Sequence, residues 1–277
     1  MQRAGVQEEV EVDPLGNFEN FEQICPESVR GLQKRGIMSL FPVQYRTFQR
    51  IWNREDIMVR DLTGSGKTLA FCLPMVEYMR KNRLFHSGKP VAMVLAPTRE
   101  LALQITKELN ALKHNDREYS VLTVYGGVSI DDQTYQLRRG VDFFVGTTGR
   151  VKDHIERGNF QFGNLKMCVL DEADQMLNLG FKEDVEKIMG AIKQGGPSEL
   201  QVCMFSATIP TWVHRIASMF MQQPLAVLDL VSSLKNKTSR TVDHLAINCP
   251  YHNRISALAD ILICYGVGQC IVFTSTK

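Results

Sequence analysis

The stretch DIMVRDLTGSGKT, from Asp56 to Thr68, decides the fold of this chain. An apolar run suitable for a buried strand leads into glycine-rich residues 63–68, and helix-forming residues follow from Leu69. A strand, a glycine-rich turn and a helix in this order are typical of a phosphate-binding loop, because backbone N–H groups and the positive end of the helix point at one anion. The alternative is a glycine-rich strand-to-helix turn that binds nothing.

Two residues of this loop carry side chains suited to a nucleotide. Lys67 is expected to reach the β- and γ-phosphates, and Thr68 to place its hydroxyl on Mg²⁺. The usual pattern G-x-x-x-x-G-K-[ST] is only partly met, because its first glycine position is Asp61 here. The predicted nucleotide-binding residues of the loop are Thr63, Gly64, Ser65, Gly66, Lys67 and Thr68.

Length and charge set the outer limits. A chain of 277 residues is long for one domain and short for two full α/β domains, which favours one domain plus an appendage. Its 32 basic and 30 acidic residues give a net charge of +2, too balanced to indicate a nucleic-acid partner by itself. Any such binding is therefore expected to arise from local geometry.

Cysteine usage and hydropathy indicate a soluble intracellular protein without a membrane partner. The seven cysteines lack the paired spacing of metal ligands, so no zinc site is predicted. Cys168, Cys203 and Cys270 lie in apolar runs, as expected of buried thiols in a reducing compartment. No apolar run approaches the ~20 residues of a membrane span, and the first residues are too polar for a secretory signal.

The middle of the chain alternates between two hydrophobic patterns. Apolar, β-branched runs predict strands at residues 57–59, 91–96, 120–125, 141–145, 167–170, 202–205 and 226–228. Helical patterns are present at residues 26–35, 42–50, 69–80, 100–112, 151–157, 183–192 and 212–220. This alternation predicts an α/β fold, a parallel sheet with helices on both faces, whose ligands bind at the carboxyl ends of the strands.

A second chemical signal follows the predicted strand at residues 167–170, which ends in the acidic run Asp171-Glu172-Ala173-Asp174. An acidic pair beside a phosphate loop is what Mg²⁺-dependent hydrolysis of a nucleoside triphosphate requires. Asp171 is expected to hold the metal through water, and Glu172 to orient or deprotonate the attacking water. The alternative is that these residues only cap the next helix, since acidic side chains favour helix N-termini. Two such motifs, each following a strand, make that alternative the weaker one.

With these motifs in order, the chain resembles the DEAD-box RNA helicases, and its overall sequence is most similar to the nucleolar RNA helicase 2 group. The resemblance implies ATP and Mg²⁺ as cofactors. GIMSLFPVQ, from Gly36 to Gln44, resembles the motif that recognises adenine, with Gln44 on the adenine edge. An upstream aromatic normally stacks on the base; Phe18 is the first choice and Phe21 the second. Taken by itself, Gln44 is better explained as a solvated helix residue, and only the ordered set of motifs favours the adenine contact.

The same resemblance assigns RNA contacts to three further motifs. They are Pro97, Thr98 and Arg99; Gly126 and Gly127; and Thr148, Gly149 and Arg150. Backbone N–H groups, helix starts and arginines grip phosphates without reading bases, so the predicted binding is largely sequence-nonspecific and salt-sensitive. Taken singly, Thr98 is equally consistent with a helix N-cap and the glycine pair with a turn.

Asp174, Ser206 and Thr208 match the residues that link hydrolysis to strand separation in this family. Two departures from the family pattern affect the site. Asp61 precedes the phosphate loop, and we expect its carboxylate to face away from phosphate or to pair with a cation such as Arg60. Thr148 replaces a proline, and it is a candidate cap for the helix that begins near Gly149.

The resemblance also divides the chain. It predicts a flexible arm at residues 1–17, a RecA-like P-loop NTPase domain at 18–231, a linker at 232–241 and the start of a second RecA-like domain at 242–277. In that last part, strands at 242–249 and 270–274 are expected to flank a helix at 255–265, forming a βαβ fragment that is mobile or weakly docked. The family's arginine motif H-R-x-G-R-x-x-R is not in this sequence, so little ATP turnover is expected of the chain alone.

The implied function is that of an ATP-dependent RNA helicase, with Lys67, Asp171 and Glu172 carrying the chemistry. The implied partners are RNA, a second RecA-like domain and ribosome-assembly proteins, in the nucleolus or, alternatively, the cytoplasm. Two other functions remain open. One is a nonenzymatic RNA-binding or assembly module, suggested by Asp61, and the other is a DNA-directed ATPase on the same fold.

Overall fold

The computed structural model describes residues 13–232, 245–266 and 268–274. They belong to two units, Met1–Lys235 and Asn236–Lys277. Residues 1–12 of the predicted arm and residues 233–241 of the predicted linker lie outside the described residues.

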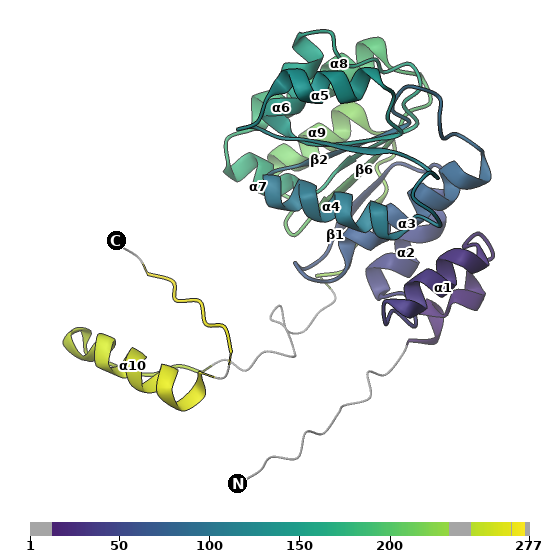
Figure 1. Cartoon of the computed structure of the whole chain (residues 1–277). Coiled ribbons are helices and arrows are strands. Elements are labelled where there is room, and N and C mark those ends of the chain that lie inside the picture. Colours follow the sequence, from purple (N-terminus) through teal and green to yellow (C-terminus); the bar gives the residue numbers. More distant parts are fainter. Residues whose placement is uncertain (1–12, 233–244, 267, 275–277) are drawn as a thin grey trace. The chain divides into compact units, whose positions relative to one another are not determined.

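A seven-stranded sheet forms the centre of the larger unit, with strand order β3-β4-β2-β5-β6-β1-β7 (Figure 1). Every neighbouring pair is parallel, as the alternating sequence pattern predicts. The strands are β1 Ile57–Arg60, β2 Ala92–Ala96, β3 Val121–Val124, β4 Phe143–Thr147, β5 Met167–Leu170, β6 Gln201–Ser206 and β7 Val227–Asp229. Each lies within two residues of a predicted strand, because strands buried on both faces are near-continuous apolar runs that stand out in a sequence.

Helices cover both faces of this sheet (Figure 1). Side chains alternate along a strand, so Ile57 and Val59 belong to one apolar core and Met58 to the other. The first core is completed by α1 Pro26–Lys34, α2 Pro42–Trp52, α3 Lys67–Lys81 and α4 Arg99–Ala111. The second is completed by α5 Ile130–Arg138, α6 Thr148–Glu156, α7 Ala173–Asn178, α8 Lys182–Gly195 and α9 Thr211–Phe220. The two layers hold the sheet rigid and leave the carboxyl ends of its strands at one edge.

The sequence patterns miss two helices and misjudge one end of the larger unit. Helix α5 is mostly polar and α7 has six residues, so neither shows a clear helical period. Residues 13–17, predicted to be flexible, are ordered instead. Asp13 caps the short 3-10 helix Pro14–Gly16 and accepts a hydrogen bond from the Tyr45 hydroxyl at 2.7 Å, which fixes this segment against α2.

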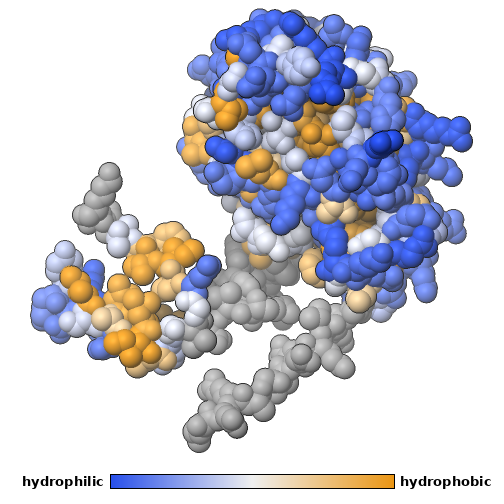
Figure 2. Space-filling view, viewed as in Figure 1, coloured by the Kyte–Doolittle hydropathy of each residue, from blue (hydrophilic) through white to orange (hydrophobic). Residues whose placement is uncertain are grey.

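The smaller unit contains the predicted helix, α10 Arg254–Tyr265, but not the predicted strands. Among the described residues, 245–250 and 270–274 form no strand. Two short segments separated by a helix have too few neighbours to complete a sheet, and apolar side chains such as Ile271 and Phe273 remain exposed. Figure 2 shows apolar surface on this unit. Cys270 is exposed too, whereas Cys168 and Cys203 are buried as predicted. In the described part of the chain, no helix has the length and apolar character needed to span a bilayer.

Candidate nucleotide and nucleic-acid site

The predicted site residues meet at the carboxyl edge of the sheet, and the strand order sorts them into two groups. Apart from Phe18 and Gln44, which precede β1, the predicted nucleotide and coupling residues follow β5, β6 and β1, which are neighbours in the sheet. The predicted RNA residues follow β3, β4 and β2, which are also neighbours. The groups meet where β2 pairs with β5, and there the N–H of Asp171 donates to the carbonyl of Leu95 at 3.0 Å. The fold therefore places two adjacent sites on one rigid edge.

The phosphate loop turns between β1 and α3 with a glycine at its tightest point. Gly66 has φ +92° and stands directly before the first residue of α3. The backbone conformation requires glycine here, and a Cβ would also lie 2.5 Å from Nε2 of Gln44, so the Gln44 side chain would have to move away. The loop thus exposes its backbone N–H groups at the start of α3, the arrangement that binds phosphate.

Lys67 bridges the base of this loop. Its side chain is buried, and Nζ donates to the carbonyls of Asp61 at 2.9 Å and Leu62 at 2.6 Å. Both acceptors lie where the chain leaves β1, so the ammonium group lies across the loop from its own helix. This position is the one expected for a lysine that meets the phosphates of a nucleotide.

The carboxylate of Asp61 does not pair with Arg60, contrary to one of the two expected outcomes. Asp61 Oδ1 instead accepts a hydrogen bond from the N–H of Leu62 at 2.8 Å. The guanidinium of Arg60 forms an ion pair with Asp229 at 3.1 Å, because β7 lies directly beside β1. The Asp61 carboxylate is thereby held by the first backbone N–H of the loop.

Gln44 contacts the phosphate loop directly. Its Oε1 accepts from the N–H of Phe41 at 2.8 Å, and its Nε2 donates to the carbonyl of Gly66 at 3.1 Å. The side chain is 5% exposed, so the solvated alternative is excluded. Gln44 therefore connects the start of α2 with the loop, and a movement of Gly66 would change its hydrogen bond.

Asp171 and Glu172 follow β5, which β6 separates from β1 and its phosphate loop. Burial, followed by the negative charge of Glu172, raises the pKa of Asp171 to about 7 against the opposing charge of Lys67. Burial also raises the pKa of Glu172. Glu172 has φ +51°, a left-handed conformation that costs a non-glycine residue about 1–3 kcal/mol and is found mostly at functional sites. Carboxylates with raised pKa values accept protons more readily, and their burial at one site makes both candidates for a functional role.

Asp174, Ser206 and Thr208 are brought together as the sequence analysis expects. The carboxylate of Asp174 accepts from the Thr208 hydroxyl, and the N–H of Asp174 donates to Ser206 Oγ at 3.2 Å. Burial raises the pKa of Asp174, but the hydrogen bonds from Thr208 and Ser206 outweigh it, so the pKa lies below its ordinary value. The acidic run after β5 is thus tied to the end of β6.

A pocket of about 370 Å³ lies between these elements. Seven of the residues that the sequence analysis assigns to the nucleotide site line this pocket: Gln44, Gly64, Gly66, Lys67, Thr68, Asp171 and Glu172. It is also lined by Arg35 and Glu108, which form a two-bonded ion pair at 2.8 Å and were missed because they are 73 residues apart in sequence. Phe18 is only partly buried, whereas Phe21 is buried with its ring against Phe48, which leaves Phe18 the more accessible ring.

The residues present fit a magnesium nucleotide. Ser65 Oγ is buried without a hydrogen-bond partner, as expected of a hydroxyl in a loop that binds an oxygen-rich ligand. Thr68 and Asp171 supply oxygen atoms to the same pocket, and oxygen is the ligand that Mg²⁺ prefers. Lys67 supplies the positive charge that phosphates require.

The first predicted RNA motif is held between β2 and α4. Thr98 is the N-cap of α4, and its Oγ1 accepts from the N–H of Leu101 at 3.3 Å, so the capping alternative describes its side chain correctly. Pro97 is buried before it, and Arg99 is exposed, with its guanidinium 4.4 Å from the ring centre of Tyr125. The start of α4 therefore presents backbone N–H groups and one arginine together.

The other two motifs follow β3 and β4. Gly126 and Gly127 lie in open space, and Gly127 has φ +82°, so this turn requires glycine for its conformation. Thr147, not Thr148, is the N-cap of α6; Thr148 is the first helical residue, and its buried Oγ1 has no hydrogen-bond partner. Thr148 thus continues the strand into the helix, which displaces the predicted cap by one residue.

Arg150 is positioned by a side chain that sequence patterns do not reveal. Its Nη1 donates to the carbonyl of Val128 and to Oε1 of Gln133, both at 2.9 Å. Gln133 is buried on α5, the helix that was not predicted. The side chain of Arg150 is therefore fixed next to the glycine turn.

Comparison with known proteins agrees with this geometry. The DEAD/DEAH box helicase family matches residues 41–216. Mouse ATP-dependent RNA helicase DDX50 is 40% identical over 267 residues, which are 95% of this chain and 36% of that protein. DEAD-box ATP-dependent RNA helicase 7 of Arabidopsis thaliana is 41% identical over 277 residues, which cover 98% of this chain and 41% of that protein.

Two further relatives complete the comparison. Nucleolar RNA helicase 2 of Rattus norvegicus is 38% identical over 267 residues, 95% of this chain and 34% of that protein. The solved structure of a DEAD box protein from Methanococcus jannaschii superposes with a TM-score of 0.70 at 28% identity, covering 89% of this chain and 63% of that one. The chain spans 34% to 41% of the length of these curated relatives.

Proposed function

Because this chain belongs to the DEAD/DEAH box helicase family, we propose that it is the ATP-binding part of an ATP-dependent RNA helicase. The observation that carries this proposal is the pocket in which Lys67, Thr68, Asp171 and Glu172 converge. The relatives named above as ATP-dependent RNA helicases support it.

Each residue has a separate role in nucleotide binding and hydrolysis. Lys67 and the N–H groups of residues 64–68 hold the phosphates, and Gln44 selects adenine with Phe18 on its ring face. Thr68 and Asp171 hold Mg²⁺, which neutralises charge that develops on the phosphates. Glu172 orients the attacking water and accepts its proton, a role that suits a carboxylate with a raised pKa.

RNA binds along the adjacent half of the same edge. The helix starts at Thr98 and Thr148, the turn at Gly126 and Gly127, and the arginines Arg99 and Arg150 contact its phosphates and sugars. These groups read no bases, so binding is sequence-nonspecific and weakens with salt. Contacts to the 2′-hydroxyl distinguish RNA from DNA.

Strand separation requires a second RecA-like domain that closes over ATP and RNA. Closure favoured by both ligands bends the RNA, and hydrolysis restores the open state. The motif H-R-x-G-R-x-x-R, which supplies arginines to the γ-phosphate, is not in this sequence, and such arginines contribute ~10³ to 10⁵ in rate. We therefore expect this chain to bind ATP with little turnover of its own.

The cellular role that we propose is ribosome biogenesis or rRNA processing, in the nucleolus and together with ribosome-assembly proteins. The support is the printed name of one set of relatives, the nucleolar RNA helicases 2 of rat and mouse. The test is the position of the tagged protein in cells relative to a nucleolar marker. Cytoplasmic location would contradict this part of the proposal while leaving the biochemical part intact.

The decisive experiment measures MgATP binding and ATP turnover by residues 1–277, with and without single-stranded RNA. Lys67→Ala should abolish MgATP binding, because it removes the phosphate cation of the loop. Lys81→Ala is the matched control, since Lys81 is exposed at the far end of the same helix. Glu172→Gln should preserve binding and suppress any turnover.

The outcomes distinguish the two rival functions. RNA binding without any MgATP affinity would overturn the proposal in favour of a nonenzymatic RNA-binding module. Equal stimulation or binding by DNA and RNA of the same sequence would favour a DNA-directed ATPase. Robust RNA-stimulated turnover would contradict the expected need for a second domain.

A further inference from the structure

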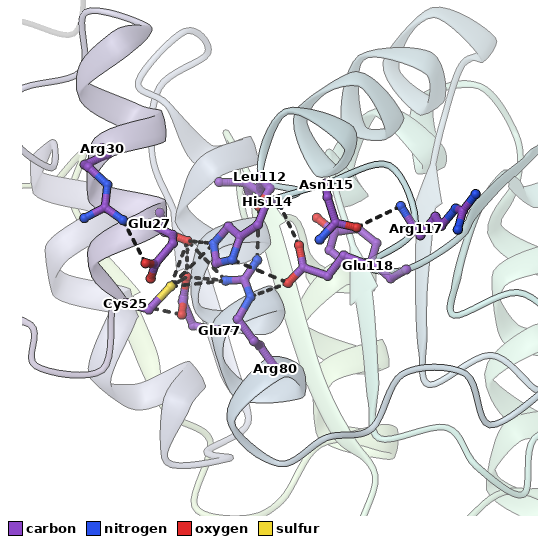
Figure 3. Close-up of polar contacts among 12 residues, drawn as sticks. Cys25, Glu27, Arg30, Glu77, Arg80, Leu112, His114, Asn115, Arg117 and Glu118 are labelled. Carbon is purple, nitrogen blue, oxygen red and sulfur yellow. Dashed lines mark hydrogen bonds and ion pairs between the residues drawn. The ribbon is translucent and has the colours of Figure 1, made fainter.

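A cluster of metal-binding side chains lies in the first core layer, outside the nucleotide pocket. It consists of Cys25, Glu77 and His114, shown in Figure 3. Cys25 stands directly before α1, Glu77 lies in α3, and His114 follows the end of α4. One ligand atom from each lies within 4.8 Å of the others. Of the residues that the structure describes, only these three form such a group.

Two of the three distances between these atoms match those of ligands around one tetrahedral zinc ion. Cys25 Sγ lies 3.5 Å from Nε2 of His114 and 3.6 Å from Oε1 of Glu77. With a Zn–S bond of about 2.3 Å and Zn–N or Zn–O bonds of about 2.0 Å, a tetrahedral angle separates sulfur from nitrogen or oxygen by ~3.5 Å. Cys25 therefore stands at ligand separation from both Glu77 and His114 before any ion is bound.

We propose that Cys25, Glu77 and His114 bind a single Zn²⁺, with water as the fourth ligand. A thiolate and an imidazole select a borderline-soft ion such as zinc over Mg²⁺ or Ca²⁺, which prefer oxygen ligands alone. An adjoining pocket of about 450 Å³, lined by Cys25, Glu77 and Arg80, gives the ion and its water a path from solvent.

The surrounding charges favour a divalent cation despite a neighbouring arginine. Arg80 lies against Glu77 and Glu118, each at 2.5 Å. Its positive charge opposes metal binding, but the two carboxylates outweigh it, and Cys25 adds a further negative charge when it binds the metal as a thiolate. Glu118 also lies 3.8 Å from Nδ1 of His114, on the side away from the thiol. This separation is longer than a hydrogen bond, so Glu118 must move closer to become the carboxylate partner that a metal-binding histidine usually has.

Binding exchanges a defined set of hydrogen bonds. The Ser28 hydroxyl now donates to Glu77 Oε1 and lies 3.1 Å from His114 Nε2. Arg80 Nη1 also donates to Glu77 Oε1 at 2.5 Å and lies 3.8 Å from Cys25 Sγ, so the ion must replace Arg80 as well as Ser28 at these ligand atoms, and Arg80 keeps Glu118 as its partner. The Cys25 thiol releases its proton to solvent as the metal–sulfur bond forms. Zinc affinity is consequently expected to rise with pH, as for other thiolate sites.

A zinc ion here would join three separate segments of the larger unit. Cys25 lies 52 residues from Glu77 and 89 residues from His114, so no local spacing motif marks the site in the sequence. An ion that binds the folded state alone stabilises it by mass action. The ion would connect the start of α1 to α3 and to the turn after α4, independently of the nucleotide pocket.

The test is Co²⁺ titration of the metal-free full chain, because Co²⁺ replaces zinc and reports its ligands by absorption. We expect one equivalent of Co²⁺ to give a thiolate-to-metal charge-transfer band and tetrahedral d–d bands, both displaced by one equivalent of Zn²⁺. Cys25→Ser should remove the charge-transfer band, and His114→Gln should weaken binding at least tenfold. Cys264→Ser is the matched control, because Cys264 is exposed on α10.

Circular dichroism and MgATP affinity show whether each variant keeps its fold. The proposal also predicts that Zn²⁺ raises the melting temperature of the wild-type chain but not of Cys25→Ser. A charge-transfer band that persists in Cys25→Ser, or a folded wild-type chain that gives none, would overturn the site. Loss of MgATP binding by Lys67→Ala bears only on the proposed function, so the two proposals fail separately.

Discussion

The carboxylate of Asp174 accepts two hydrogen bonds from Thr208, at 2.9 Å from its backbone N–H and at 2.7 Å from its hydroxyl. Asp174 belongs to the acidic run after β5, and Thr208 follows β6, the neighbouring strand. A shift of the acidic run during nucleotide binding therefore acts directly on the segment after β6.

The bonds to Thr208 also predict a pH-dependent part of the stability. They hold the pKa of Asp174 below its ordinary value of 3.8, so the ionised form is favoured in the folded state. Its contribution is present above pH 3.8 and is lost as the pH falls through the folded pKa. Asp174→Asn should cost about 1 kcal/mol at neutral pH, a figure that allows for solvent screening of this half-buried group, and clearly less near pH 3. Urea unfolding of both proteins across this range measures the difference, and a constant difference would contradict the prediction.

Asp171 has the opposite pH dependence. Burial and the charge of Glu172 raise its pKa from 3.8 to about 7, so its ionisation opposes folding of the ligand-free chain. The destabilisation begins above pH 3.8 and is complete above about pH 7. Asp171→Asn should therefore stabilise the ligand-free chain at pH 8 by a few kcal/mol and change it little near pH 4, because one pKa unit corresponds to about 1.4 kcal/mol.

The control for Asp171→Asn is Asp116→Asn, which changes an exposed carboxylate far from the acidic run in sequence. Melting temperatures at several pH values without nucleotide or metal make the comparison. An Asp171→Asn variant that is less stable than wild type at pH 8 would show that the carboxylate is not penalised by burial. MgATP should stabilise wild type more than the variant, because the variant loses a metal ligand.

Much of this site is visible in the sequence for a physical reason. Parallel strands are buried on both faces, so their apolar runs locate the carboxyl ends at which Lys67, Asp171 and Ser206 stand. Glycine patterns such as 63–66 are equally visible, because Gly64 and Gly66 adopt left-handed conformations that other residues avoid. The sequence therefore locates the strand ends beside which these residues lie.

The remaining part depends on packing between distant segments. The ion pair of Arg35 with Glu108 and the cluster of Cys25 with His114 are formed by helices that meet only after folding. Helix α5 was missed because its surface is polar, and with it Gln133. The expected strands of the smaller unit show the reverse problem, since apolar runs predict strands even where no neighbouring strand is available.

The close contact between α2 and the phosphate loop predicts the effect of Gly66→Ala. The new methyl group would meet Nε2 of Gln44 at 2.5 Å, on a backbone with φ +92°. We expect a loss of about 1–3 kcal/mol in stability and a marked loss of MgATP affinity. Gly31→Ala is the matched control, because Gly31 lies within α1 with no atom near the added Cβ, and it should stabilise by about 0.5–1 kcal/mol. Chemical unfolding and nucleotide titration of both variants test this, and an unaffected Gly66→Ala would contradict the geometry.

Gln133 is predicted to position Arg150 for RNA. Its Oε1 lies 2.9 Å from Arg150 Nη1 and 3.1 Å from Nε2 of the buried His154. Burial lowers the pKa of His154 to about 4, so the ring is neutral at pH 7. Asn159 donates to Nδ1 of this ring, which leaves the proton on Nε2, directed at Gln133. Gln133 thus accepts from both side chains and fixes them relative to each other.

Gln133→Ala removes the shared acceptor and leaves the buried His154 N–H without a partner. We expect a loss of about 1–3 kcal/mol in stability. RNA affinity should fall several-fold, because Arg150 loses one of its two hydrogen bonds and keeps only the carbonyl of Val128 and the 3.7 Å ion pair with Asp153. MgATP affinity should not change, since α5 lies on the half of the edge that holds the predicted RNA residues.

Gln136→Ala, an exposed change on the same helix, is the control. Fluorescence anisotropy with a labelled single-stranded RNA measures the affinities below the melting temperature. If Arg150→Ala weakens RNA binding and Gln133→Ala does not, Arg150 is positioned without Gln133, and the glutamine has only a structural role.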